Sequence, residues 1–121
     1  GKEPVKTASE SMVFNRKVFL ERMMGDEEFA HDVAAGFLEE LPTMLGALKE
    51  QINRRDCESI WKHAHKLKGS AANVGGEALR DLALEVEQAG KAGDLTEVAR
   101  WIPELETQVA RLSEALRQWE N

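Results

Sequence analysis

The chain has 121 residues, of which 42% are hydrophobic, and this length and composition suit one domain with a single core. The formal net charge of −6 argues against a nucleic-acid partner, because such binding depends on Lys and Arg that neutralise phosphates. The one cysteine, Cys57, excludes an internal disulfide and favours a reducing, cytoplasmic location. No apolar run approaches the ~20 residues that cross a bilayer, so we expect no membrane contact by this chain.

Apolar residues recur at helical spacing along almost the whole chain, and strand-like alternation is absent, so the sequence predicts an all-α protein. Residues 1–12 are mostly polar or small and have no sustained periodicity. We therefore expect them to be a linker or remnant segment that precedes a folded part spanning residues 13–121.

Five helices are predicted, with Asn15, Asp56 and Asp94 as N-caps because their short polar side chains suit that position. In chain order they run from Asn15 to near Met24, from Asp26 to about Arg54, from Asp56 to the pair Gly75 and Gly76, from about Glu77 to Lys91, and from Asp94 through Trp119. The first is short, and the four long ones with short connections favour an up-down-up-down four-helix bundle that the first helix closes at one end.

Each long helix carries an apolar stripe at steps of three or four residues, which indicates the side that faces a common core. The predicted inward residues are Phe29, Val33, Phe37, Leu41, Leu45, Leu48 and Ile52 in the second helix; Ile60, Ala64, Leu67, Ala71 and Val74 in the third; Leu79, Leu82, Ala83 and Val86 in the fourth; and Val98, Ile102, Leu105, Val109, Leu112, Leu116 and Trp119 in the fifth.

The third helix contains His65, and helical geometry predicts where this side chain points. At about 100° per residue the apolar stripe of this helix covers about 80°, and His65 lies about 120° from its centre, toward solvent. Lys68, Gly69 and Ala72 follow at the spacings that place them on the same surface as His65. An imidazole therefore has a cation beside it and little bulk around it.

This combination suits the chemistry of phosphate. A neutral imidazole can attack phosphorus because its second nitrogen holds the proton. The ammonium of Lys68, one turn away, can reach the oxygens of a bound phosphoryl group as a point charge. Gly69 costs about 1 kcal/mol in a helix interior relative to Ala, and we expect it to leave room for a partner's active site.

The segment AHKLKGSAANVGG, residues 64–76, resembles the signature of histidine-phosphotransfer (HPt) domains, whose pattern is H-x-x-K-G followed by small residues. The resemblance extends upstream to FLEELPTML, residues 37–45, and downstream to LRDLALEVEQAGKAGD, residues 79–94. It implies that His65 accepts the phosphoryl group, that Lys68 supports the phosphate, and that Gly69 gives clearance to the partner.

The resemblance further implies a phosphorelay in which the receiver domains of response regulators exchange phosphate with this domain, as in a module of a hybrid sensor kinase. The receiver then supplies magnesium, and we expect this domain to bind no cofactor itself. Receivers are expected to dock on the second and third helices, with Trp61 and Ala72 near the contact. Trp61 is equally well interpreted as a residue at the boundary of the core.

Two other functions are compatible with the same sequence pattern. A chemotaxis-type kinase has a phosphoacceptor domain with the same H-x-x-K-G pattern, which receives phosphate from an attached kinase domain. A non-catalytic helical protein-binding module would make His65 incidental.

His63 and His65 point about 160° apart on a helix, so we expect no metal site there, and His31 is predicted to be a solvated surface residue. No ATP-binding loop motif occurs, and a bundle built from one chain is expected to be a monomer.

Overall fold

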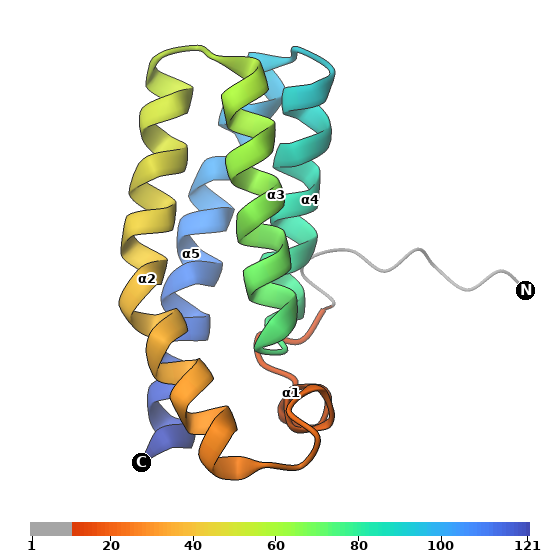
Figure 1. The fold of residues 1–121 in the computed structure, drawn as a ribbon. Coiled ribbons are helices and arrows are strands. Elements are labelled where there is room, and N and C mark those ends of the chain that lie inside the picture. The colour runs from red at the N-terminus through yellow and green to blue at the C-terminus, as the bar shows by residue number, and fades with distance from the viewer. Residues whose placement is uncertain (1–10) are drawn as a thin grey trace, which may run out of the picture.

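Five α-helices and no strand make up residues 11–121, the part of the chain that the computed structural model describes (Figure 1). The helices are α1 (Arg16–Arg22), α2 (Glu27–Asn53), α3 (Cys57–Asn73), α4 (Glu77–Lys91) and α5 (Leu95–Glu120). The prediction of an all-α chain with one short and four long helices is confirmed. α2 continues through Pro42 and α5 through Pro103 without a break in the helix.

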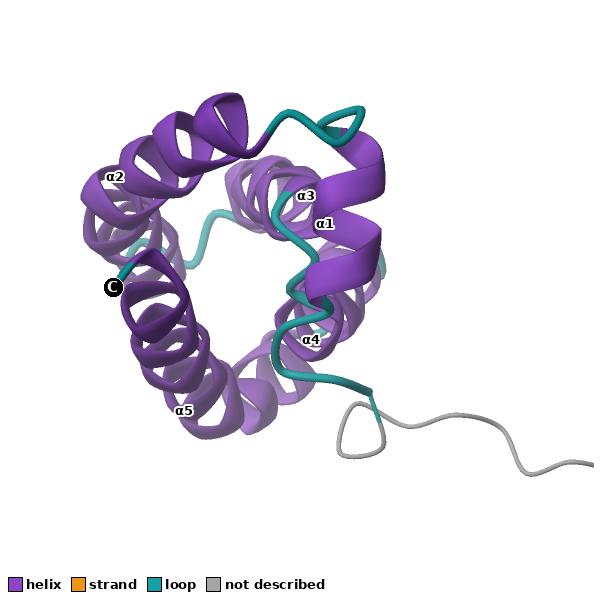
Figure 2. Cartoon of the chain, turned by 90° about the horizontal axis from the view of Figure 1, so that it is seen from below, coloured by secondary structure: helices purple, strands orange, loops and turns teal. Residues whose placement is uncertain are grey.

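The four long helices run alternately up and down, and each packs against the helix before and after it in the chain, with α5 returning to α2 (Figure 1). Seen along the bundle axis, they surround a common centre, and α1 lies across the lower end near α3 and α4 (Figure 2). The predicted up-down-up-down bundle, closed at one end by the first helix, is therefore present.

Side-chain caps explain where four of the helices begin. The side-chain oxygens of Asn15, Asp26, Asp56 and Asp94 each accept a hydrogen bond from the backbone N–H three residues later, at distances between 3.0 and 3.2 Å. Each cap satisfies a backbone donor that the first helical turn leaves without a partner. The three caps predicted from the sequence are confirmed.

The end of α3 is joined to the start of α1 through Gly75. The backbone N–H of Asn15 donates to the Gly75 carbonyl oxygen at 2.7 Å, and Gly75 has a φ of +73°. A Cβ at this position would overlap with the backbone carbonyl of Asn15. Glycine is therefore required here for both its conformation and its size.

The core is made by the inward faces of all four long helices together with Phe19 of α1. All of the inward residues predicted for α3 and α4 are buried. The fully or almost fully buried large side chains are Phe19, Leu41, Leu48, Ile60, Leu67, Leu79, Leu82, Leu105, Leu112, Leu116, Val74 and Val86. Within residues 11–121, no helix has both the length and the apolar character needed to cross a membrane.

One prediction about the start of α2 is wrong. Phe29 was expected inside, but it is 51% exposed, and Ala30 and Ala34 are buried instead. Three successive steps of four residues separate Phe29 from Leu41 and turn it about 120° around the helix, whereas Ala30 lies only about 20° from Leu41.

His31 was expected to be a solvated surface residue, and its side chain is 44% exposed, but its ring also stacks on that of Trp119, with the ring centres 4.2 Å apart. Its Nδ1 also lies 3.8 Å from the Glu120 carboxylate. The last turn of α5 therefore covers this part of α2.

Only the end of the predicted linker falls within the described residues. Ser11 is buried and its hydroxyl donates to the Asp81 carboxylate, while the Met12 carbonyl accepts the Ala78 N–H at 2.9 Å. These contacts place residues 11 and 12 against α4. Residues 1–10 of the predicted linker lie outside the described part of the chain.

Candidate functional site

His65 lies in the middle of α3 on the side that faces away from the core. Its neighbours Ala64 and Leu67 are buried, and these residues fix the rotation of the helix. The His65 side chain is 62% exposed, as the helical geometry of the sequence predicted. α3 therefore presents this imidazole to solvent from a rigid element.

The imidazole of His65 is held by Glu87, which comes from the neighbouring helix α4. The distance from His65 Nδ1 to Glu87 Oε2 is 3.0 Å, and the Glu87 side chain is only 4% exposed. An ionised carboxylate can only accept a hydrogen bond, so Nδ1 carries the hydrogen and donates it. In the neutral ring the lone pair then belongs to Nε2.

Two lysines share the same buried carboxylate. Lys68 Nζ lies 2.6 Å from Glu87 Oε1, and Lys91 Nζ lies 3.3 Å from Glu87 Oε2. Lys68 comes from α3, one turn after His65, and Lys91 comes from α4, one turn after Glu87. His65, Lys68, Glu87 and Lys91 form what we call the Glu87 cluster.

The cluster keeps Glu87 ionised. Burial by itself raises the pKa of the Glu87 carboxyl, but hydrogen bonds from Lys68, His65 and Lys91 together lower that pKa from 4.5 to about 2. At neutral pH the carboxylate therefore remains a fixed negative charge that orients the His65 ring and does not take its proton.

Gly69 lies beside His65 and is exposed. A Cβ built at Gly69 would meet no atom within 4 Å outside its own helix backbone, so the glycine is not explained by the packing of another helix. Ala72, one further turn along the same face, is half-buried. The surface next to the imidazole thus carries almost no side-chain bulk.

Trp61 is half-buried at the contact between α3 and α4. Lys91 Nζ lies 4.9 Å from the centre of its ring, and Lys62 Nζ lies 5.9 Å from it. A Cβ at Gly90 would lie 3.0 Å from Trp61 Cβ and 3.1 Å from its backbone nitrogen. Gly90 therefore allows α4 to approach α3 closely at this point, which brings Glu87 and Lys91 to the histidine.

Glu87 is the site residue that sequence reasoning missed. It follows Val86 and lies four residues after Ala83, both of which are buried, so it falls on the apolar side of α4. A carboxylate on the buried face of an amphipathic helix was the available signal, because charged residues are almost never buried without a partner. The partner lies 22 positions earlier, on another helix.

The other histidine of α3 takes no part in this cluster. His63 Nδ1 lies 2.7 Å from the backbone carbonyl oxygen of Ser59, one turn earlier, so this ring is tied to its own helix. Across residues 11–121, no three His, Cys, Asp or Glu side chains gather closely enough to hold a metal ion.

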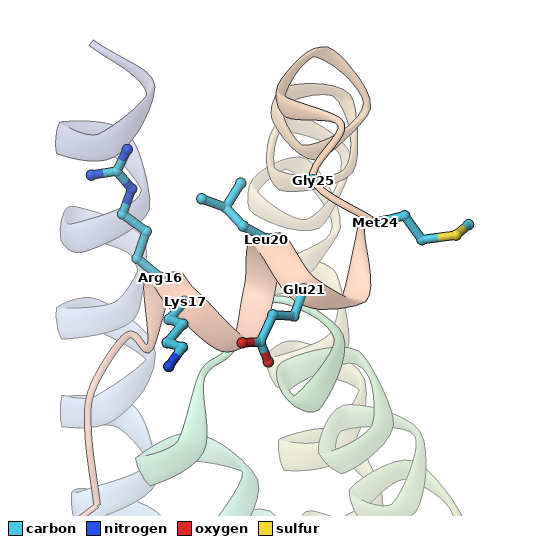
Figure 3. Close-up of a pocket in the computed structure, with 6 residues that line it drawn as sticks. All are labelled: Arg16, Lys17, Leu20, Glu21, Met24 and Gly25. Carbon is cyan, nitrogen blue, oxygen red and sulfur yellow. The ribbon is translucent and has the colours of Figure 1, made fainter.

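Two of the surface hollows formed by residues 11–121 lie outside the cluster. One lies along α1, where the labelled Met24 points away from the other five lining residues and is 92% exposed (Figure 3). The other lies between α2 and α3 and is lined by Gly36, Glu39, Glu40, Thr43, Met44 and Lys66. The second adjoins the exposed side of α3 through Lys66, the residue that follows His65.

The comparison with protein families matches residues 32–115 to the Hpt domain. The chain belongs to the Hpt family. The matched range contains all four residues of the Glu87 cluster and most of the four long helices, so the family assignment and the geometry concern the same part of the chain.

Individual relatives of this Hpt domain are distant. The phosphorelay intermediate protein rdeA of Dictyostelium discoideum is 23% identical over 111 residues, which cover 88% of this chain and 44% of rdeA. The aerobic respiration control sensor protein ArcB of Escherichia coli is 26% identical over 88 residues, which cover 73% of this chain and 11% of ArcB. The Hpt chain thus spans less than half the length of either relative.

Solved structures share the fold of this Hpt domain. Histidine-containing phosphotransfer protein B of Pseudomonas aeruginosa superposes with a TM-score of 0.82 at 20% identity, covering 88% of this chain and 93% of that one. The HPT domain of a sensor hybrid histidine kinase from Shewanella gives a TM-score of 0.77 at 20% identity, with 88% and 92% covered. The five-helix bundle is therefore an Hpt-type fold.

Proposed function

We propose that this Hpt domain is a phosphorelay intermediate that accepts a phosphoryl group on Nε2 of His65 and donates it again. The exchange takes place with aspartyl phosphates on response-regulator receiver domains. The main support for this proposal is the contact between His65 Nδ1 and the buried carboxylate of Glu87 at 3.0 Å. The His65 side chain is nevertheless 62% exposed. This contact fixes the tautomer and leaves Nε2 as the nucleophile.

The chemical step is an in-line transfer. The lone pair of Nε2 attacks the phosphorus of the aspartyl phosphate, an N–P bond forms, and the P–O bond to the aspartyl carboxylate breaks with its electron pair leaving on that carboxylate. The imidazole keeps its hydrogen on Nδ1, so positive charge develops on the ring. The Glu87 carboxylate stabilises this charge, since it accepts the Nδ1 hydrogen bond at 3.0 Å.

Lys68 stabilises the transferred group. Its ammonium lies one turn from His65 and is 26% exposed, so a modest change of side-chain torsions brings it from Glu87 to the oxygens of the phosphoryl group. Gly69 gives the partner's active site room to approach Nε2, because no side chain occupies that place. These roles make the domain a rigid carrier of a nucleophile.

The receiver domain supplies the remaining catalytic groups, including the magnesium ion, and this domain binds no cofactor of its own. Receivers dock over the exposed side of α3 and the adjoining α2. The half-buried Ala72 and Trp61 lie on α3, seven residues after and four residues before the histidine. The hollow between α2 and α3, which contains Glu39, Glu40 and Lys66, offers charged groups to the same partner.

The test mixes the purified domain with a panel of radiolabelled phospho-receivers and magnesium. Wild type and His63→Ala should take up acid-labile, alkali-stable label, and His65→Ala should take up none. His63 is the matched control, because it lies two residues away on the same helix and is bound to its own backbone. Label that persists in His65→Ala would reject the site.

Two rival functions have distinct outcomes in the same assay. Label that arrives only from an ATP-dependent kinase domain, and never from receivers, would favour the phosphoacceptor domain of a chemotaxis-type kinase. A wild type that takes label from neither donor would favour a protein-binding module in which the histidine is incidental.

A further inference from the structure

The two lysines of the Glu87 cluster are held in different ways. Lys91 is anchored twice: its Nζ lies 3.3 Å from Glu87 Oε2 and 4.9 Å from the centre of the Trp61 ring. Lys68 is anchored once within residues 11–121, by Glu87 Oε1 at 2.6 Å. Attraction to an aromatic face adds to an ion pair. Lys91 therefore has two contacts, although its side chain is 54% exposed, whereas Lys68 has one shorter contact and a side chain that is 26% exposed.

The lysines also lie on opposite sides of the histidine along α3. Lys68 follows His65 by three residues, on the side of Gly69 and Ala72 where the surface is open. Lys91 lies over Trp61, which precedes His65 by four residues. Lys68 is therefore the cation that can turn toward a phosphoryl group on Nε2, and Lys91 is the cation that stays.

If Lys68 turns to the phosphoryl group, Glu87 loses one of the cations that pair with it. The carboxylate is only 4% exposed, and a buried charge that loses its partner is strongly disfavoured. At the same moment Glu87 must remain negative, because it supports the positive charge on the phosphorylated imidazole. A second cation that stays at Glu87 when Lys68 moves keeps the carboxylate both paired and ionised.

We propose that Lys91 is a positioning residue that keeps Glu87 paired while Lys68 turns to the phosphoryl group on His65. This inference rests on the proposed phosphotransfer function. Lys91 acts through Glu87 and does not touch the phosphoryl group. Its contribution is larger in the phosphorylated state, because in the unphosphorylated state Glu87 also has Lys68.

The test measures how phosphate partitions at equilibrium between a receiver and this domain, which does not depend on how fast the two proteins dock. Lys91→Met should lower the phosphorylated fraction of the domain by about tenfold in the partition constant, because Lys68 must then serve two anions. Lys91→Arg should restore the wild-type value, since a guanidinium can pair with the carboxylate and stack on Trp61.

Lys62→Met is the matched control. Lys62 lies 5.9 Å from the centre of the same Trp61 ring, but it pairs with Glu58 at 2.9 Å and not with Glu87. Its removal should leave the partition constant unchanged. Before phosphorylation, Lys91→Met and Lys62→Met should unfold at similar urea concentrations, which separates the expected effect from a general loss of stability.

A double variant tests the mechanism itself. In a Lys68→Met background no cation leaves Glu87 on phosphorylation, so adding Lys91→Met should change the partition constant little. An undiminished effect in that background would overturn the proposal, because it would mean that Lys91 contacts the phosphoryl group directly. An unchanged partition in the single variant Lys91→Met would overturn it too.

The failure of this inference can be told from failure of the proposed function. If wild type takes label from receivers and His65→Ala does not, the proposed function stands, and the result for Lys91→Met decides the inference about Lys91. If wild type takes no label from receivers, both are overturned.

Discussion

Replacing Glu87 with glutamine removes one buried negative charge and keeps the length and shape of the side chain. The amide can still accept the hydrogen bond from His65 Nδ1, but Lys68 and Lys91 lose their counter-charge. We expect the variant to be less stable than wild type at neutral pH, and we expect this difference in the free energy of unfolding to shrink as the pH falls.

The magnitude follows from the pKa of Glu87. Its value in the folded protein, about 2, lies below the ordinary value of 4.5, and each pH unit of that difference is worth about 1.36 kcal/mol, so the charge contributes at most about 3 kcal/mol. This is an upper bound because His65 and Lys91 are more than half exposed and water screens them.

The direction of the pH effect is fixed by the sign of the pKa shift. A carboxyl whose folded pKa is lowered stabilises the protein fully above its unfolded pKa, and it loses that contribution as the pH falls toward the folded pKa. For Glu87 the loss begins near pH 4.5 and is complete near pH 2. About 2 kcal/mol of the about 3 kcal/mol is lost by pH 3.

The assay is urea denaturation followed by far-UV circular dichroism at several pH values from 7 to 3. The difference between wild type and Glu87→Gln should fall by up to about 2 kcal/mol over this range. Glu58→Gln is the control, because it removes an exposed carboxylate whose pair with Lys62 is worth at most about 1 kcal/mol. If the difference between wild type and Glu87→Gln stays constant from pH 7 to pH 3, the pKa of Glu87 is not lowered in the folded protein.

Three further predictions concern stability and assembly. Gly69→Ala should raise the free energy of unfolding by up to about 1 kcal/mol, because the added Cβ meets no atom. Gly90→Ala should lower it by about 1 to 3 kcal/mol, because the added Cβ would lie 3.0 Å from Trp61. The reverse order of stability in urea denaturation would contradict this packing. Asp56→Ala should cost about 1 kcal/mol in the same measurement through loss of the α3 cap, and Asp56→Asn should restore most of it. Sedimentation equilibrium should give the mass of one chain at all concentrations, and a tight dimer would contradict the expected monomer.

The exposure of His65 could be predicted because it depends only on its own helix. The inward stripe of α3 alternates steps of four and three residues, whose rotations around the helix largely cancel from Ile60 to Val74, and every residue of that stripe is buried. The same reasoning failed for Phe29, because a series of four-residue steps drifts around a long helix and reached solvent at its start. Helical periodicity therefore predicts burial best where steps of three and four residues alternate.

The contacts between helices could not be predicted in this way. Glu87 reaches His65 because Gly90 lets α4 approach α3, and neither fact is a property of one helix. His31 and Trp119 stack across 88 positions of sequence, so nothing near His31 in the sequence indicates the contact. The sequence therefore predicted the exposed position of His65 and the lysine near it, and it missed the buried carboxylate that contacts both.

The most direct test of phosphotransfer through His65 is to identify the nitrogen that becomes phosphorylated. The domain, labelled with ¹⁵N in its histidines, is phosphorylated by a phospho-receiver and magnesium, and the imidazole nitrogens are assigned by NMR through their coupling to phosphorus. Because Glu87 holds Nδ1, we expect one new N–P bond, at Nε2 of His65, with the hydrogen retained on Nδ1. Phosphorus on Nδ1 of His65, or on either nitrogen of His63, would contradict it.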